Sequence, residues 1–571
     1  MFHDSNDRPV IVPTRSRARA AVACLRKATP LLIGLLATLQ AAAQGAATPR
    51  FPIAETTIGD IHAAFEAGTL SCRELASRYL ARIDAYDVNG PALNSIQTVN
   101  PRVLEDAAAL DAEHARSGPT GPLHCIPIVL KDNINTTEMP TTSGSAILAS
   151  SAAREDATIV ARLEAAGALI LGKAAMGELA AGSYSTAGGQ QRNPYNPDRD
   201  PGGSSSGSGA AVAANLTAIA VGTDTYTSVR GPAADTGIVG FRPTTGLVSR
   251  AGIGPRKTNI DTAGPMARTV EDAAILLNVL AGPDPADPLS LEVHARYAAQ
   301  AKTADGYVDF TQSLSTTALD GARLGVVRDF FGGDPEIDAL AEAALATLEA
   351  EGAELVEVRL DPALAGPYVR DWIGTLDNIL VYAFWQAWDA YLETLALAPG
   401  VPGTVAGWVE AYETELAAGR YPPAVGGFSA LSMMRASLER SASDPAYVDL
   451  IERVLPEVTR LKLAIFETHG VDALVFPYRS AFAPPISNPL ETIEDSSFVA
   501  ASGVPSPAVL GGYSSVGFPM LVVPMGFGSQ GLPTGIGFMG RPYEEGRVFG
   551  YGFDYEQASG LRRASPLVPE L

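Results

Sequence analysis

The sequence predicts a single large α/β domain, and three observations support this. Segments with the apolar spacing of helices alternate with short apolar runs typical of buried strands. Hydrophobic residues make up 46% of the 571 residues and charged residues 18%, a composition that can fill a large core and excludes a disordered or fibrous chain. No stretch resembles an interdomain linker, because the Gly/Ser run at 202–209 is short and lies between apolar elements.

The predicted elements alternate along the chain. Ile58, Ile61, Ala64 and Phe65 share one face of a helix that begins after Thr57. The expected elements, in chain order, are two helices within 57–86, a strand at 126–130, a helix at 157–166, a strand at 168–171, a helix at 210–216, a strand at 218–221, a helix at 270–281, a variable and mainly helical region at about 284–455, and strands at 473–476 and 520–523.

Residues 1–43 have the organisation of a secretory signal peptide. Basic residues at 15–27 precede an apolar stretch at 31–39, and small residues follow, with cleavage expected near Ala43. The apolar stretch is shorter than the about 20 residues that span a bilayer. We therefore expect a secreted or periplasmic protein with no stable membrane insertion after cleavage; an uncleaved anchor is the alternative.

Charge and cysteine content narrow the possible partners. The chain has 41 Lys+Arg against 63 Asp+Glu, a formal net charge of −22, so nucleic acid and anionic membranes are not expected partners. Of the three cysteines, Cys24 lies in the leader, and Cys72 and Cys125 could either pair or stay free. The six histidines are scattered without HExxH spacing, so no metal site built from Cys or His is expected.

Lys131 stands at the end of an apolar run, where an ammonium group is unusual. One interpretation is a lysine that reaches the surface or pairs with Asp132. The other is a lysine that burial keeps neutral, because burial can lower a lysine pKa by up to about 5 units. A neutral amine near pH 7 could act as a general base.

Two serine-containing loops follow this lysine. Gly202–Gly209 opens a helix and contains a formal G-x-S-x-G around Ser205, but a polar, proline-rich segment precedes it instead of the strand that a nucleophile elbow needs. It could equally be a flexible loop or an anion-binding turn. Gly222–Arg230 directly follows an apolar run and places Ser228 just past a predicted strand end, where α/β proteins locate site residues. Taken alone, this loop could equally be an ordinary turn from a strand to a helix.

Taken together, these segments resemble the amidase signature family. The similarity covers about residues 55–560, is weakest at 284–455, and gives an expected amidase domain at 51–565. Several motifs occur in the family's order, which makes the resemblance specific. The motifs are Gly121–Asn133, Gly202–Gly209, Gly222–Arg230, Gly240–Val248, Gly264–Arg268, Gly517–Met520 and Gly531–Gly540.

The resemblance implies site residues at matching positions. Lys131 matches the family's base, Ser204 its bridging serine with an unusual cis peptide, and Ser228 its nucleophile. The implied fold is a twisted mixed sheet of about eleven strands covered by helices on both faces, with no metal or organic cofactor. The family's oxyanion hole matches the backbone N–H groups of Thr225, Tyr226, Thr227 and Ser228. Ser205, Asp224 and Arg230 are expected to be supporting residues. For Asp224 and Arg230, which flank Ser228, a bond that holds the loop is favoured over direct catalysis.

Three functions remain open from the sequence. The first is an exported serine amidohydrolase acting on a small-molecule amide or short peptide amide, or on an ester or carbamate. The second is an amidotransferase subunit that passes ammonia to a partner, which the leader and the acidic charge disfavour. The third is a catalytically silent binding protein. No oligomeric state is predicted.

Three other features carry smaller expectations. Many family members have glycine before the nucleophile, whereas this chain has Tyr226-Thr227, and we expect that loop to keep ordinary φ values with Tyr226 narrowing the entrance. Gly172–Glu178 resembles a family turn in which Lys173 is structural. An aromatic group at helical spacing could pack in the core or line an apolar pocket: Trp372, Phe384, Trp385, Trp388 and Tyr391.

Overall fold

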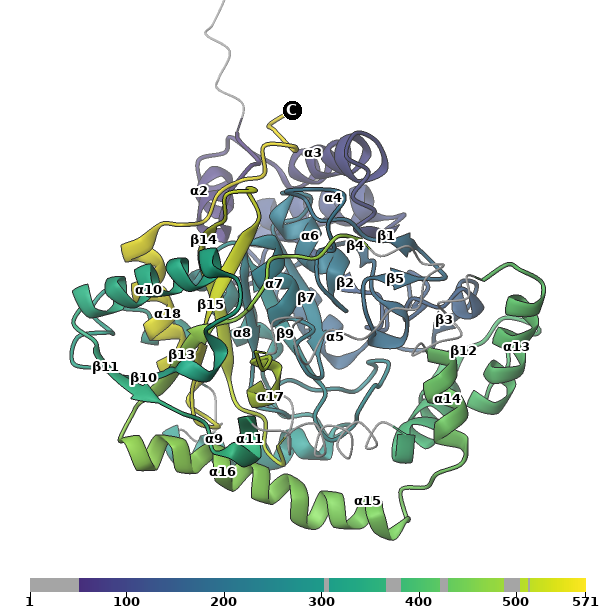
Figure 1. Ribbon diagram of the computed structural model, residues 1–571. Helices are drawn as coiled ribbons and strands as arrows, with labels where there is room; N and C mark the ends of the chain where they lie inside the picture. The colour runs from purple at the N-terminus through teal and green to yellow at the C-terminus, as the bar shows by residue number, and fades with distance from the viewer. Residues whose placement is uncertain (1–50, 302–307, 366–380, 422–429, 487–503, 512–513) are drawn as a thin grey trace, which may run out of the picture. The chain divides into compact units, whose positions relative to one another are not determined.

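The computed structural model describes residues 51–301, 308–365, 381–421, 430–486, 504–511 and 514–571 (Figure 1). The expected signal peptide and Trp372 lie outside these residues. An eleven-stranded sheet forms the centre of the fold, which confirms the predicted fold class. Its strands run in the order β1 (Ile96–Val99), β4 (Leu169–Ala174), β2 (Pro127–Lys131), β7 (Ile219–Asp224), β9 (Thr262–Ala267), β8 (Val239–Arg242), β14 (Met520–Phe527), β15 (Pro533–Met539), β13 (Ala473–Pro477), β10 (Arg323–Val327) and β11 (Glu354–Val358).

The sheet is mixed. Strand β2 is parallel to both β4 and β7, and β10 is parallel to both β11 and β13. The remaining neighbours are antiparallel, including β7 with β9 and β14 with β15. Because β2 and β7 are parallel neighbours, their carboxyl ends meet at one edge of the sheet, which is where α/β proteins place functional residues.

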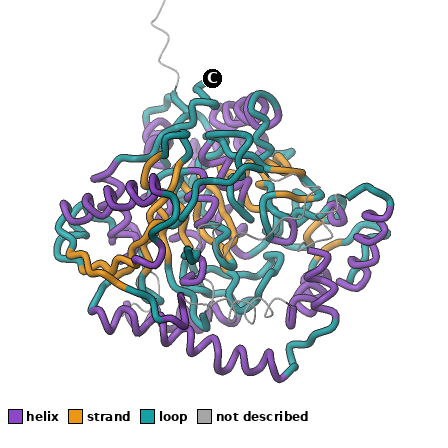
Figure 2. Tube along the Cα trace, viewed as in Figure 1, coloured by secondary structure: helices purple, strands orange, loops and turns teal. Residues whose placement is uncertain are grey.

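Helices cover both faces of the sheet (Figure 2). Strands β2, β4, β7, β9 and β15 are buried at every residue, which requires cover on both sides. The helices are α2 (Ile58–Glu66), α3 (Cys72–Arg82), α4 (Val103–Ser117), α5 (Thr158–Ala165), α6 (Ser206–Ala213), α7 (Arg230–Thr236), α8 (Val270–Leu280), α9 (Pro288–Ala301), α10 (Pro335–Ala350), α11 (Pro362–Ala365), residues 381–393, α13 (Val405–Ala417), α14 (Ala430–Leu438), α15 (Pro445–Asp449), α16 (Leu455–His469), α17 (Ala508–Gly511) and α18 (Glu545–Ser559).

The structure differs from the sequence-based expectation in five strand-forming regions of the main sheet. The region 284–455, expected to be mainly helical, also contributes β10 and β11 to the main sheet. Each of these strands is only five residues long, and α10 between them makes a helical crossover that dominates the local pattern. Strands β1 and β8 were not predicted and are only four residues long. Strands β9 and β15 were not predicted either, because glycine and proline within them lower the local strand propensity.

Residues 381–393, α13 and α14 form a unit that we call the outer helical segment (Figure 1). Its apolar faces meet in a buried cluster that includes Trp388 and Trp408 and extends to Leu179. The expected aromatic group therefore packs in a core: Phe384, Trp388 and Tyr391 are buried there, and Trp385 packs against it. Among the described residues, no helix has the length and apolar character needed to cross a bilayer.

Candidate active site

Lys131 is the last residue of β2 and is completely buried. Its Nζ donates to Ser204 Oγ at 2.7 Å and to the carbonyl oxygen of Thr223 at 3.2 Å. The alternative partner considered from the sequence, Asp132, lies instead 3.7 Å from the Nζ of Lys173. Lys131 therefore points into the site at the carboxyl ends of β2 and β7, whereas Lys173 fills a separate buried position.

The surroundings of Lys131 favour its neutral form. Burial lowers its pKa to about 7, with Asp224 and Asp261 opposing this effect and Arg256 adding to it. A lysine pKa in ordinary surroundings is about 10.4, so an exposed lysine would be almost fully protonated at neutral pH. Here a large fraction of the amine is neutral and able to accept a proton.

Ser204 lies in the loop before α6, and the Gly203–Ser204 peptide bond is cis. The neighbouring Ser205 has a different environment. Its Oγ donates to the carbonyl oxygen of Thr223 at 3.1 Å and accepts from the Thr223 N–H at 3.2 Å. Its own N–H donates to the carbonyl oxygen of Ser228 at 3.2 Å. Ser205 thus joins the two serine loops through backbone groups, in keeping with a supporting position.

Ser228 lies between the end of β7 and the start of α7. The residue is 8% exposed, compared with 1% for Ser204 and 0% for Lys131. A nucleophile must be reached by its substrate, whereas a proton relay behind it need not be. Of the residues predicted as the triad, Ser228 is the most accessible and Lys131 the least, which is the order that a relay from lysine to nucleophile requires.

A buried ion cluster supports the Ser228 loop. The carboxylate of Asp224 accepts hydrogen bonds from the Val229 N–H at 3.1 Å, from Arg230 Nε at 3.0 Å and from an Arg242 terminal nitrogen at 2.9 Å. Burial alone would raise the pKa of Asp224, but the two guanidinium groups hold it well below its usual range. Asp224 is therefore ionised and acts through the loop that it holds.

The same arginines orient the peptide groups before Ser228. Arg242 donates to the carbonyl oxygens of Asp224 at 2.7 Å and Thr225 at 3.3 Å, and Arg230 donates to that of Tyr226. In a trans peptide the N–H points opposite to the C=O. The arginines hold these three carbonyl groups on their own side of the loop. The N–H groups of the next residues, 225–227, therefore point away from the arginines, toward the side of the loop where an oxyanion would bind.

Three of the four candidate oxyanion donors are available in the described structure. Within it, the backbone N–H groups of Thr225, Thr227 and Ser228 donate to no protein acceptor. Tyr226 and Thr227 both keep negative φ, so the loop needs no glycine to adopt its course. Each also has a partner of its own: Thr227 Oγ1 lies 2.8 Å from the hydroxyl of Tyr478, and the ring of Tyr226 packs under the Nζ of Lys257 at 4.0 Å.

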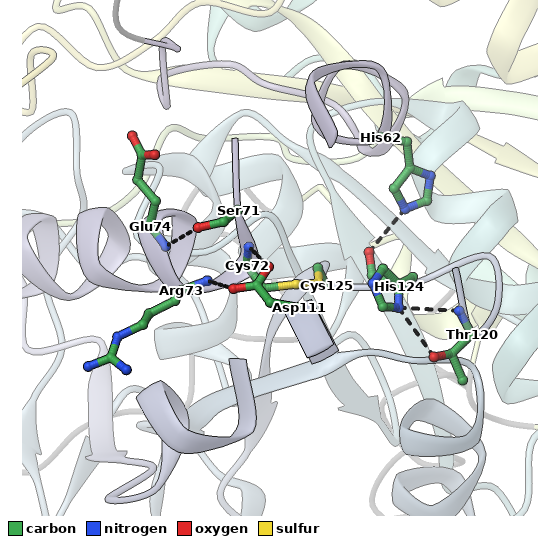
Figure 3. The surroundings of a disulfide bond; sticks show 9 residues. All are labelled: His62, Ser71, Cys72, Arg73, Glu74, Asp111, Thr120, His124 and Cys125. Atoms are coloured by element: carbon green, nitrogen blue, oxygen red, sulfur yellow. Dashed lines mark hydrogen bonds between the residues drawn. A yellow bond between two sulfur atoms is a disulfide. The ribbon is translucent and has the colours of Figure 1, made fainter. Parts of the chain in front are cut away.

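The cysteines left open by the sequence form a disulfide, Cys72–Cys125, with a Cα–Cα distance of 5.4 Å (Figure 3). Cys72 is the first residue of α3, whose N-terminal N–H groups Asp111 caps, and Cys125 precedes β2 by two residues. With His124, the cysteines place three possible metal ligands within 4.8 Å of one another. Because the sulfurs bond to each other, the thiolates that a metal ion would need are not present.

Sequence reasoning missed two residues of this site. Arg242 lies inside the Gly240–Val248 motif that carried the resemblance, and its place in that motif was the available signal. Tyr478 directly follows β13, so a hydroxyl at the end of a buried strand was visible, but nothing local connects it with a residue 251 positions away.

Comparison with known proteins agrees with this geometry. The Amidase family profile matches residues 74–549. A glutamyl-tRNA(Gln) amidotransferase subunit of Halorhodospira halophila is 36% identical over 521 residues, covering 90% of this chain and 99% of the relative. The chain therefore belongs to the amidase signature family, and it is an amidase-family enzyme.

Solved structures provide the second comparison. The peptide amidase PAM, crystallised with the competitive inhibitor chymostatin, is 35% identical, with a TM-score of 0.77 over 90% of this chain and 100% of that chain. The native peptide amidase from Stenotrophomonas maltophilia is 34% identical, with a TM-score of 0.76 over 91% of this chain and 100% of that chain.

Proposed function

We propose that this protein is an exported serine amidohydrolase that cleaves carboxylic amides, with C-terminal peptide amides as its substrate class, through an acyl-enzyme on Ser228. The observation that carries the proposal is the hydrogen bond of 2.7 Å from the buried Nζ of Lys131 to Ser204 Oγ. A lysine that can lose its proton and a hydroxyl that can relay one stand behind the more exposed Ser228.

The first half of the reaction forms the acyl-enzyme. A serine hydroxyl is a poor nucleophile until a base removes its proton. Ser204 can take the proton of Ser228 while giving its own to neutral Lys131, because a hydroxyl both donates and accepts. Ser228 Oγ then attacks the amide carbonyl, and the N–H groups of the loop at 225–228 stabilise the oxyanion.

The second half regenerates the enzyme. The protonated lysine returns its proton through Ser204 to the leaving amine, and the C–N bond breaks to leave an ester on Ser228. Water then attacks this ester, losing a proton along the same route, and releases the carboxylic acid. Lysine has one nitrogen and no tautomers, so the relay does not require the orienting third group that a histidine needs.

The substrate class follows from the comparisons and from the chain's charge. The overlap with two peptide amidase structures favours a peptide amide. The curated relatives are amidotransferase subunits, so transfer of ammonia to a partner protein is the second candidate. A net charge of −22 disfavours binding next to a nucleic acid such as tRNA. This supports a hydrolase over an amidotransferase subunit.

Export is supported by two independent features. The first is the predicted signal peptide at residues 1–43. The second is the Cys72–Cys125 disulfide, since disulfides persist mainly in oxidising compartments. Fractionation of the native host, with the mature N-terminus read by mass spectrometry, tests this part. Recovery of uncleaved protein from the cytoplasm alone would contradict export.

Covalent labelling tests the nucleophile. We expect a fluorophosphonate to modify Ser228, and Ser228→Ala to lose both the label and amide hydrolysis while its circular dichroism stays unchanged. Ser205→Ala is the matched control and should still be labelled, because its hydroxyl bonds only to the backbone of Thr223. Labelling that persists in Ser228→Ala would assign the nucleophile elsewhere, and a wild type that resists labelling would favour a silent binding protein.

A substrate panel tests the reaction class. Purified mature protein alone should release ammonia from N-blocked dipeptide amides faster than from free glutamine. Activity on glutamine that appears only with a partner protein would instead identify an amidotransferase subunit.

A further inference from the structure

Glu178 is a buried carboxyl group that the proposed mechanism does not use. Its two oxygens accept hydrogen bonds from the N–H and the Oγ1 of Thr186, each at 2.8 Å, and from the hydroxyl of Tyr412. The Tyr412 hydroxyl also lies 2.7 Å from Ser145 Oγ, which completes the network. All three groups can donate to the carboxyl oxygens, so the network fits the ionised carboxylate, and it accommodates an added proton only if a hydroxyl turns from donor to acceptor.

The segment that carries Glu178 lies directly behind Ser204. The Gly177 N–H donates to the carbonyl oxygen of Ser204 at 3.2 Å. A Cβ added at Gly203 would lie 2.0 Å from the carbonyl oxygen of Gly182, so the two backbones touch. The loop at 177–182 therefore determines where Ser204 sits, and Ser204 Oγ is the acceptor for Lys131.

The same carboxyl group joins this loop to the outer helical segment. Tyr412 belongs to α13, and Leu179 enters the apolar cluster that holds Trp388 and Trp408. Glu178 thus connects the variable part of the fold with the backbone behind the relay serine. Thr186 fixes its other side, and Arg256 donates to the carbonyl oxygen of Leu179 at 2.8 Å.

The surroundings of Glu178 place its titration in an accessible range. Burial raises its pKa to about 7, while hydrogen bonds from Tyr412, Thr186 and Ser145 oppose the rise. The phenols that interact with it are those of Tyr184, Tyr412 and Tyr421, whose own pKa values are raised by burial, so they stay neutral there.

We propose that Glu178 is a positioning residue for Ser204: its carboxylate, held by Tyr412 and Thr186, fixes the loop at 177–182 and so couples the outer helical segment to the Lys131–Ser204 relay. This inference rests on the proposed hydrolysis through Ser228. When the carboxyl group takes up a proton, one hydroxyl must turn from donor to acceptor, and the remaining hydrogen bonds lose the charge that strengthened them. The loop is then held less firmly, and Ser204 is no longer kept in its position in front of Lys131.

This arrangement makes hydrolysis depend on two deprotonated groups, Lys131 and Glu178. Since kcat/KM reports ionisations of the free enzyme, its logarithm should rise with a slope approaching two per pH unit below about pH 6. A relay that needed only Lys131 would give a slope of one. The experiment measures kcat/KM from pH 4.5 to 9 with a peptide amide that carries no titrating group.

The decisive variant is Glu178→Gln, which keeps the shape of the side chain but cannot ionise. Its slope should fall to one, and its kcat at high pH should drop roughly 10- to 100-fold with a smaller change in KM, because the misplaced group acts on chemistry. The matched control is Glu545→Gln. Glu545 is also buried, has a pKa raised by burial to about 7, and accepts from the Thr244 N–H and from Tyr297, but it contacts neither serine loop. This control should keep a slope of two.

A milder variant covers the possibility that Glu178→Gln fails to fold. Tyr412→Phe removes one donor to the carboxylate, so the pKa of Glu178 rises and the acid limb of the profile moves to higher pH. A slope of two in Glu178→Gln, a slope of one in the wild type, or an unmoved limb in Tyr412→Phe would each overturn the inference. A wild type without hydrolysis or Ser228 labelling would instead overturn the proposed function.

Discussion

The hydroxyl of Thr227 lies 2.8 Å from the hydroxyl of Tyr478, so the residue just before Ser228 is tied to the end of β13. Strand β13, which Tyr478 directly follows, is far away in the sequence but forms part of the same sheet. The ring of Tyr478 also packs against the guanidinium of Arg230 at 5.6 Å. The side chain of Thr227 is therefore used to hold the loop.

Tyr478→Phe should loosen this loop without emptying the space that the ring fills. Loss of one hydrogen bond should lower the free energy of unfolding by about 1 kcal/mol. We expect kcat to fall about three- to tenfold because the N–H groups beside Ser228 lose rigidity. Chemical denaturation and steady-state kinetics measure the two effects. An unchanged kcat would show that the arginines alone hold the loop.

Lys131→Met should stabilise the fold while abolishing hydrolysis. The folded-state pKa is lowered to about 7, so below pH 7 folding must bury a charge or remove a proton that the unfolded chain keeps. The free-energy penalty for burying Lys131 is complete below its pKa in the folded protein. It disappears as the pH rises toward the pKa of the same lysine in the unfolded chain, near 10.5. We therefore expect a gain of a few kcal/mol at pH 6 that shrinks by pH 10. Thermal unfolding of both proteins across this range provides the measurement.

Lys131→Arg is the companion to this variant. A guanidinium stays protonated at every relevant pH and cannot serve as the base, so the activity should not return. Wild-type activity in Lys131→Arg would rule out the neutral-lysine mechanism. A wild-type profile highest near pH 4 would contradict it as well.

Removal of the Cys72–Cys125 disulfide should lower stability with little effect on chemistry. The cysteines are 53 positions apart, and a closed loop of that length stabilises by about 4 kcal/mol in the chain-entropy account. The double variant Cys72→Ala with Cys125→Ala should therefore melt well below the wild type and match the reduced wild type. Calorimetry with and without dithiothreitol measures this. Equal melting temperatures for the oxidised and reduced wild type would contradict it.

The sequence predicts much of the site because its residues fall in short motifs. Lys131, Ser204 and Ser228 each lie at the end of an apolar run or in a Gly/Ser loop, so local pattern and family resemblance both point to them. Arg242 and Tyr478 reach the same site through strand pairing. No local pattern says that β8 lies beside β9 or that the end of β13 meets the Ser228 loop, since these contacts exist only after the sheet assembles.

The strands, like the site residues, divide into those that the local sequence predicts and those that form only when the sheet assembles. Apolar runs such as 218–221 predict strands correctly because the signal is in the residues themselves. Strands β9 and β15 contain Gly264, Pro265, Gly535 and Gly537, and tertiary pairing overrides their weak propensity. The burial of Glu178 could not be foreseen either, because its partner Tyr412 belongs to a helix 234 positions later.

The last prediction concerns Tyr226-Thr227, where many relatives have glycine. Both residues keep negative φ, and each contacts a partner, Lys257 and Tyr478 respectively. The loop is thus held by side chains where a glycine loop relies on backbone freedom. Tyr226→Gly with Thr227→Gly removes both contacts and adds freedom to the unfolded chain, so stability should fall by about 1–2 kcal/mol or more.

The kinetic effect of that double variant should fall on selectivity. Tyr226 lies two residues before Ser228, and we expect removal of its ring to enlarge the space beside Ser228. The ratio of kcat/KM values between bulky and small acyl groups should therefore change at least tenfold, while the best substrate is cleaved no faster than by the wild type. Loss of one oxyanion donor typically costs about 10²–10³ in kcat, so a native loop with misdirected N–H groups would be severely handicapped. A hundredfold gain on every amide tested would reveal such a handicap and contradict the assignment of a competent hydrolase.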